Sequence, residues 1–86
     1  MTAIRVLYFA WVRQKAGTGA EEVSPPPEVN TVGALMEWLA ARSPGHAAAF
    51  SHPGQVRAAV NQAFRGPGDP AAPGDEVAFF PPVTGG

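Results

Sequence analysis

The chain has 86 residues, six Lys and Arg against seven Asp and Glu, a net charge of −1 and no cysteine. This length predicts one domain with a single small core. The balanced charge, without a basic run, argues against nucleic-acid binding. The missing cysteines exclude a disulfide framework, a thiolate metal site and a cysteine nucleophile. No signal-peptide pattern and no membrane-spanning apolar run is found, so we expect a cytoplasmic protein without a membrane partner.

The predicted elements begin with a strand over residues 3–12. Its apolar side chains alternate between two faces, with Ile4, Val6 and Tyr8 on one and Leu7 and Phe9 on the other. Because both faces are largely apolar, we expect a central strand or a strand covered on both sides. A glycine turn at residues 17–19 leads to a weaker strand at residues 21–23, which we expect to pair antiparallel with the first. Three prolines at residues 25–27 end it, because proline cannot donate to a ladder.

One clear helix is predicted over residues 31–43. Thr31 is a suitable N-cap, since its hydroxyl can accept a hydrogen bond from an unpaired N–H of the first turn. The apolar residues follow helical spacing and form one stripe, which consists of Val32, Leu35, Met36, Leu39 and Ala40. Pro44 and Gly45 are expected to stop the helix. The stripe predicts a helix that packs on the core rather than a cofactor-binding segment.

The second half of the chain predicts three more strands. Residues 46–54 are expected to form a connector with a short helical piece at residues 47–50. A strand over residues 55–62 follows, and one of its faces carries Val56, Ala58 and Val60. Its last two residues, Asn61-Gln62, are expected to turn the chain into a short strand that contains Phe64.

A turn-rich segment at residues 66–75 leads to the last predicted strand, residues 76–80. The strand alternates, with Val77 and Phe79 on one face and Ala78 and Phe80 on the other. The order is therefore two strands, a helix and three strands. This order predicts an α+β fold in which a mixed sheet carries one main helix on one face.

No conventional active site is predicted inside the chain. His46 and His52 fall in the connector and are expected to be solvated, and a zinc site would need a third ligand that their spacing does not supply. Residues 66–68, Gly-Pro-Gly, lack the lysine and the following helix of a phosphate loop. Asp75 and Glu76 are adjacent, so they face opposite ways in a strand. We therefore expect no metal site and no cofactor bound by this chain.

The last six residues, 81–86, read Pro-Pro-Val-Thr-Gly-Gly. Proline fixes φ, and Pro81 favours an extended Phe80, so we expect a stiff segment that leaves the sheet. Gly85 and Gly86 have no Cβ, so this end could enter a channel too narrow for side chains. It would deliver a carboxylate, which can be activated as an acyl-adenylate. Two glycines alone would favour an ordinary frayed end, but the residues before them point to a functional terminus.

Three blocks resemble, in matching order, the small subunit of molybdopterin synthase, a MoaD-type sulfur carrier. They are Val6–Ala10, Ala58–Gln62 and the highly specific ending Gly74–Gly86. Residues 43–55 and 65–73 show no such resemblance. The resemblance implies the ubiquitin-like β-grasp fold, in agreement with the predicted order of elements. It also implies a β-grasp domain over residues 1–80 and an extended, flexible tail over residues 81–86.

The resemblance further implies a chemistry. In this family a partner activating enzyme uses ATP to adenylate the C-terminal glycine, and sulfur from a donor protein converts the adenylate to a thiocarboxylate. The corresponding residue here is Gly86, which would become 1-thioglycine. The small subunit docks on the large subunit, two copies of each form a heterotetramer, and the sulfur converts precursor Z (cyclic pyranopterin monophosphate) to molybdopterin. The catalytic pocket belongs to the large subunit, so this chain is expected to donate sulfur rather than to supply that pocket.

The residues before Gly86 are the expected partner contacts. They are Phe80, Pro81, Pro82, Val83, Thr84 and Gly85. We assign Phe79 to the core and Phe80 to the interface, where a desolvated aromatic side chain can act as an anchor. Two alternatives remain: a sulfur carrier for thiamine thiazole or tRNA thiolation, and a ubiquitin-like protein modifier or plain β-grasp interaction domain.

Overall fold

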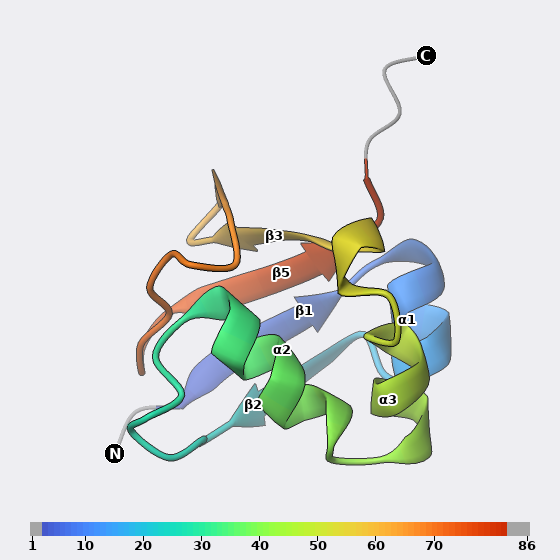
Figure 1. Ribbon diagram of the computed structural model, residues 1–86, viewed down its shortest axis with the longest axis horizontal. Coiled ribbons are helices and arrows are strands. Elements are labelled where there is room, and N and C mark those ends of the chain that lie inside the picture. Colours follow the sequence, from blue (N-terminus) through green and yellow to red (C-terminus); the bar gives the residue numbers. More distant parts are fainter. Residues whose placement is uncertain (1–2, 83–86) are drawn as a thin grey trace.

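The computed structural model describes residues 3–82 and shows a single mixed sheet with helices against it (Figure 1). The strands are β1 (Ile4–Tyr8), β2 (Ala20–Val23), β3 (Arg57–Val60), β4 (Ala63–Arg65) and β5 (Glu76–Phe80). They lie in the order β2-β1-β5-β3-β4. β1 and β5 are parallel, and the other neighbours are antiparallel. The predicted α+β class, the mixed sheet and the antiparallel pairing of the first two strands are confirmed.

The turn between β3 and β4 has the geometry that its sequence predicts. Asn61 and Gln62 both have positive φ, 51° and 72°, as in the type I′ turns whose twist matches the flanking strands. The Asn61 side chain also holds the start of β5. Its Nδ2 donates to Asp75 Oδ1 at 3.0 Å, and its Oδ1 accepts from the Glu76 N–H at 3.0 Å. One residue thereby connects the hairpin to the central strand.

The main helix, α2 (Val32–Ala40), packs its apolar stripe against one face of the sheet (Figure 1). Thr31 caps it as predicted, because its Oγ1 accepts from the Ala34 N–H at 3.1 Å. The buried stripe consists of Val32, Leu35, Met36 and Leu39. These residues share one core with the inward side chains of the two central strands, which are Ile4, Val6, Tyr8, Val77 and Phe79.

The first predicted strand is too long, because residues 10–12 belong to a helix, α1 (Ala10–Ala16). Ala10 takes a φ of 53° and turns the chain out of the sheet after Tyr8. Val12 is then buried on one side of the helix, and Gly17 ends it in the left-handed conformation, with a φ of 84°. Burial of Val12 against the core therefore overrides the strand-like pattern of these residues.

A second helix, α3 (Pro44–Ala49), fills most of the predicted connector, where only a short helical piece at residues 47–50 was expected. Pro44 does follow the end of α2, but it also occupies the first turn of α3, where its missing N–H costs nothing. Ser43 caps this helix by accepting from the His46 N–H at 3.1 Å. A 3₁₀ turn, η1 (Pro53–Gln55), then delays the start of β3 to Arg57.

Within the described residues, α2 and α3 lie on one face of the sheet with α1 at its end (Figure 1). The opposite face, called here the outer face, carries no helix in this part of the chain. Of the two alternatives for the first strand, the interior position is confirmed, because β1 is paired with β2 on one edge and with β5 on the other. Cover on both faces is not found in the described residues: Ile4, Val6 and Tyr8 are buried, whereas Leu7 is only half-buried. On the outer face, the sheet is therefore not covered by any helix of residues 3–82.

Candidate docking surface at the root of the tail

The site begins where β5 ends. β5 lies between β1 and β3, so neighbouring strands hold it on both sides. Phe80 is paired in register with Arg57 of β3, and Pro81 and Pro82 follow, each half-buried. The other predicted site residues, Val83, Thr84, Gly85 and Gly86, lie outside the described residues. The structure therefore locates the root of the predicted tail at the fixed end of a central strand.

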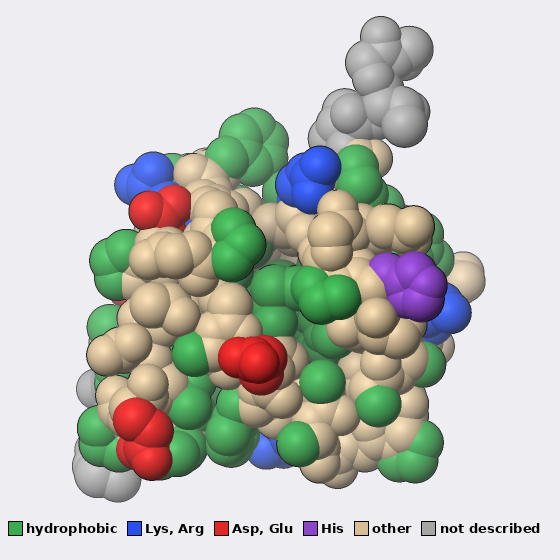
Figure 2. All heavy atoms as spheres, in the orientation of Figure 1, with side chains coloured by type: hydrophobic (Ala, Val, Ile, Leu, Met, Phe, Trp, Pro, Cys, Tyr) green, Lys and Arg blue, Asp and Glu red, His purple; other side chains and the backbone are tan. Residues whose placement is uncertain are grey.

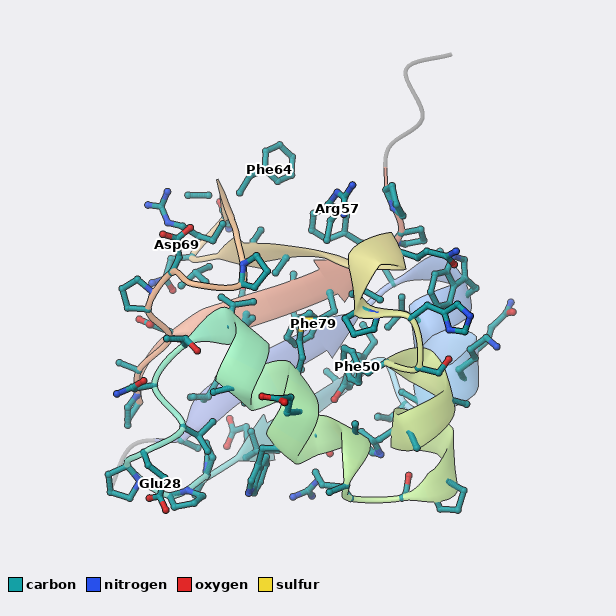
Figure 3. The ribbon with its side chains drawn as sticks, viewed as in Figure 1. Glu28, Phe50, Arg57, Phe64, Asp69 and Phe79 are labelled. Carbon is teal, nitrogen blue, oxygen red and sulfur yellow. The ribbon has the colours of Figure 1, made fainter. Side chains whose placement is uncertain are left out.

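Alternation along β5 separates its two phenylalanines. Phe79 is fully buried and packs edge to face with Phe50, with ring centroids 5.0 Å apart, and Figure 3 shows both rings inside the molecule. Phe80 lies on the outer face and is half-buried. The predicted core position of Phe79 is confirmed. The predicted partner contact of Phe80 stays a prediction, but this side chain lies on the surface where such a contact is possible.

An apolar band crosses the outer face. The strand register places Leu7 of β1 beside Ala78 of β5, Ala78 beside Ala59 of β3, and Ala59 beside Phe64 of β4. Small side chains in the middle of the band make it shallow, and the phenyl ring of Phe64 rises at its end. Leu7 and Ala78 are half-buried, Ala59 is buried and Phe64 is exposed. The exposed apolar surface of this band is therefore greatest at the Phe64 end, and surface of this kind typically marks an interaction site.

Phe64 is the most exposed large apolar side chain of the described residues, at 76%. Its ring lies 5.8 Å from that of Phe80, tilted by 50°, and Figure 3 shows it at the margin of the molecule from which the chain also leaves. Phe9, which follows β1, is 49% exposed. Phe64 was predicted to lie in a short strand but was assigned no functional role, because three residues are too few to show which face a side chain occupies.

A polar cluster on the helix-covered side corrects the interpretation of His46. This histidine is only 8% exposed, because α3 presses it against Tyr8. Its Nε2 lies 2.6 Å from Glu21 Oε2, and the Tyr8 hydroxyl donates to the same oxygen at 2.7 Å. An ionised carboxylate can only accept, so Nε2 carries a proton. Arg42 approaches the other carboxylate oxygen at 3.7 Å. The prediction of a solvated His46 is therefore wrong.

The cluster shifts two pKa values. Burial, followed by the hydrogen bond to the Glu21 carboxylate, raises the pKa of the Tyr8 hydroxyl far above its ordinary value, so it stays protonated. Burial alone would raise the pKa of Glu21, but the hydrogen bonds from Tyr8 and His46 and the nearby Arg42 outweigh it and lower that pKa. Glu21 is thus an ionised acceptor that connects β1, β2 and α3.

Ser43, His46 and Glu21 also have the residue types of a hydrolytic triad, since Ser43 Oγ lies 2.7 Å from His46 Nδ1. However, Ser43 Oγ already serves as the cap of α3, where it accepts the His46 N–H. The carboxylate is likewise occupied by Tyr8 and Arg42. Every polar atom of this arrangement therefore has a structural role, and we interpret it as a clamp that holds α3 to the sheet.

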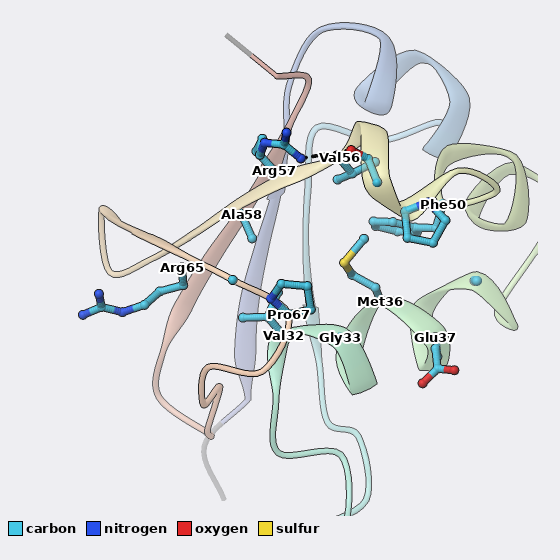
Figure 4. Close-up of a pocket in the computed structure, with 14 residues that line it drawn as sticks. Val32, Gly33, Met36, Glu37, Phe50, Val56, Arg57, Ala58, Arg65 and Pro67 are labelled. Carbon is cyan, nitrogen blue, oxygen red and sulfur yellow. Dashed lines mark hydrogen bonds between the residues drawn. The ribbon is translucent and has the colours of Figure 1, made fainter.

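An apolar groove of about 630 Å³ opens on the helix-covered side, between α2 and the segment from η1 to β3. Figure 2 shows apolar side chains gathered in a hollow on this face, and Figure 4 shows Met36 and Phe50 directed into it. Val32, Val56 and Ala58 complete its apolar wall. The groove reflects incomplete cover of the sheet by a nine-residue helix, and none of its features specifies an occupant.

Residues 3–82 contain neither a metal-binding cluster nor a membrane-spanning helix. In this part of the chain no three His, Asp or Glu side chains gather in a way that could hold a metal ion. The same residues contain no helix with the length and apolar character required to cross a bilayer.

The five-stranded order with a parallel centre, one main helix on one face and a strand running directly into the tail defines a ubiquitin-like β-grasp protein. The chain belongs to the ThiS family, whose model matches residues 6–86. It is 49% identical to the molybdopterin synthase sulfur carrier subunit of Escherichia coli, over 96% of this chain and 99% of that protein. The resemblance stated from the three sequence blocks is thereby confirmed.

Solved structures agree with this assignment. A candidate molybdopterin converting factor, subunit 1, from Pyrococcus furiosus superposes with a TM-score of 0.78 at 32% identity, covering 96% of this chain and all of that chain. Subunit 1 in a Helicobacter pylori complex of molybdopterin-converting factor subunits 1 and 2 shares the fold, with a TM-score of 0.62 at 19% identity and coverage of 98% and 99%. The predicted β-grasp fold is therefore confirmed.

Proposed function

We propose that this chain is a sulfur carrier that serves as the small subunit of a molybdopterin synthase. The observation that carries the proposal is the 49% identity to a sulfur carrier subunit over nearly the whole chain. The geometry supports it, because the tail root lies next to an exposed apolar surface.

The reactive group in this proposal is the carboxylate of Gly86. A carboxylate is a poor electrophile, so an activating enzyme first joins one of its oxygens to the α-phosphate of ATP and releases pyrophosphate. The outer sulfur of a persulfide on a donor protein then displaces AMP from the acyl carbon, and a thiol reductant cleaves the resulting disulfide to leave a thiocarboxylate, 1-thioglycine. The sulfur is held on the backbone, which explains how a chain with no cysteine can carry it. Because ATP is consumed, we place this reaction in the cytoplasm.

The partner in the second half of the cycle is the synthase large subunit. There the thiocarboxylate would deliver its sulfur to precursor Z, water would restore the carboxylate, and a second round would complete the dithiolene. The Helicobacter pylori complex shows that a protein with this fold associates with a subunit 2. We propose the same association here, in a heterotetramer of two copies of each subunit.

The tail contacts proposed from the sequence fit this cycle. Phe80 would anchor the domain, and residues 81–85 would fill the channel that leads Gly86 to the reacting molecule. Pro81 and Pro82 limit the backbone freedom lost on entry, which lowers the entropic cost of binding. The fixed end of β5 would set where that channel must begin.

Intact mass spectrometry tests the proposal directly. The chain is mixed with a candidate activating enzyme, ATP and a sulfur donor, and we expect the mass change of one oxygen replaced by sulfur, located at Gly86 by fragmentation. Adding the large subunit and precursor Z should then yield molybdopterin and return the carboxylate. A thiocarboxylate that supports only thiazole or tRNA thiolation would favour the first alternative, and isopeptide adducts on lysines of other proteins would favour a modifier.

A further inference from the structure

We propose that a hollow beside the Phe64–Phe80 pair receives an apolar side chain of the synthase large subunit that is flanked by carboxylates, with Arg57 and Arg65 as their partners. This inference rests on the proposed function and specifies the chemistry of the surface that docks there.

The hollow has a volume of about 460 Å³ and lies at the β4 edge of the sheet, where side chains of both faces line it. Its lining consists of Arg57, Ala58, Phe64, Arg65, Gly66 and Phe80. Arg57 is the register partner of Phe80, and Arg65 follows Phe64 in β4. Two exposed cations therefore border two aromatic rings whose centroids are 5.8 Å apart.

Arg57 is already positioned for a partner. Its Nη1 donates to the Gly54 carbonyl oxygen at 3.0 Å, which fixes one side of the guanidinium group and leaves the others free. Figure 3 places Arg57 on the side of the molecule where the chain leaves β5. A charge at this position would face the entrance of any channel that takes up the tail.

Neither arginine forms an ion pair with a carboxylate of residues 3–82. In the same part of the chain, Arg5 approaches Glu76 at 3.9 Å and Arg42 approaches Glu21 at 3.7 Å. The Asp69 carboxylate belongs to the loop after Arg65, but its Oδ2 accepts the Gly66 N–H at 2.7 Å. The charges around the hollow are thus left for solvent or for a partner.

These charges restrict which surface can bind. A partner that covers the phenyl rings also removes water from the guanidinium groups, and that loss is unfavourable unless a carboxylate replaces the water. Guanidinium and carboxylate groups match in planar, two-point hydrogen bonds. The whole chain has a net charge of −1, so a local positive patch also orients it toward an acidic surface during encounter. Apolar and acidic groups side by side are therefore the expected counterpart.

Charge reversal tests this inference in the full-length chain with the isolated large subunit. The variants are Arg57→Glu and Arg65→Glu, with Arg57→Lys and Arg65→Lys to retain charge. The control is Ala47→Glu with Ala48→Glu, two exposed positions on α3 that change the net charge by the same amount as one reversal. Thermal unfolding verifies that each variant is folded.

We expect each reversal to weaken binding roughly tenfold or more at low salt, mainly through slower association. The difference should shrink from about 0.01 M to about 1 M salt, as the Debye length falls from about 30 Å to about 3 Å. The α3 control should bind within about twofold of the unaltered chain. The lysine variants keep the charge but lose the two-point geometry, so their loss of binding should be smaller than that of the reversals.

Unchanged or tighter binding of the reversed variants, an equal loss in the α3 control, or a loss that is independent of salt would overturn the inference. Reversed variants that bind the activating enzyme more weakly but bind the large subunit normally would also overturn it. These results differ from failure of the proposed function. If the proposed function fails, the unaltered chain itself does not bind the large subunit. If only the present inference fails, the unaltered chain still binds the large subunit and transfers sulfur normally.

Discussion

Glu21 is the residue on which the inner polar cluster depends. Its carboxylate accepts hydrogen bonds from Tyr8 of β1 and His46 of α3, and Arg42 lies beside it after the end of α2. It is buried enough that its neighbours decide its ionisation. The cluster therefore makes the attachment of α3 to the sheet sensitive to acid.

We predict that Glu21→Gln flattens the acid side of the stability profile. The folded-state pKa of Glu21 is lowered from the ordinary value of 4.5, so its ionised form stabilises the fold above about that pH. This stabilisation is lost as the pH falls through the lowered pKa. In a pH series of thermal unfolding, the melting temperature of the unaltered protein should fall more steeply below about pH 4.5 than that of the variant. Parallel curves would show that the cluster does not control stability.

The two phenylalanines of β5 give opposite predictions at neighbouring positions. Phe79→Ala removes a fully buried ring and should cost about 3–5 kcal/mol of unfolding free energy. Phe80→Ala and Phe64→Ala should leave the fold intact and cost more than about 1 kcal/mol of binding to the large subunit or the activating enzyme. Chemical denaturation measures the first effect and calorimetric titration the second. Unchanged affinity of Phe80→Ala for both partners would remove Phe80 from the interface.

At the scale of elements, α2 and the last strand could be predicted because their patterns are long and regular. The apolar stripe from Val32 to Leu39 fits only a helix, and the alternation of residues 76–80 fits only a strand. α1 and α3 are shorter, with seven and six residues, and are stabilised largely by packing on each other and on the core. Residues 10–12 satisfy a strand pattern equally well. Only the packing of these residues against the core in the folded molecule makes them helical.

The same reasoning separates the predicted part of the site from the part that was missed. Phe80 could be assigned to the outer face because Val77 and Phe79 define the inner one. Phe64 could not, since β4 has three residues. His46 was missed because its partners are distant along the chain: Glu21 is 25 positions away. No local pattern contains such a contact.

Gly45 provides a test of how closely α1 and α3 pack. A Cβ at this position would lie 2.6 Å from the Lys15 carbonyl oxygen, which is backbone and cannot move aside cheaply. We therefore expect Gly45→Ala to cost about 1–3 kcal/mol of unfolding free energy, as other overpacked sites do. Gly54→Ala is the matched control, because a Cβ there meets nothing within 4 Å. Equal stability of the two variants by denaturation would contradict the packing of the helices.

At the scale of the whole molecule, the features that stabilise the fold and the surface proposed to contact a partner lie on opposite faces of the sheet. The helices and the polar cluster lie on one side of the sheet, while the outer face carries the apolar band and exposed aromatic rings. The chain leaves β5 between these two regions, so the proposed tail starts from a strand that both neighbours hold in place. Changes beyond Pro82 should consequently affect sulfur transfer and leave the stability of the domain almost unchanged.

The central claim is that the carboxylate of Gly86 carries the sulfur, and one comparison tests it most directly. Deleting Gly86 withdraws the carboxylate by about 3.3–3.6 Å, and a misplacement of about 1 Å can already cost roughly a hundredfold in a positioned reaction. An added C-terminal residue converts it to an amide, which cannot be adenylated. Each variant is incubated with the activating enzyme, ATP, a sulfur donor, the large subunit and precursor Z, and thiocarboxylate and molybdopterin are measured. We predict folded variants that form neither product. A variant that forms both at the normal rate would contradict the account.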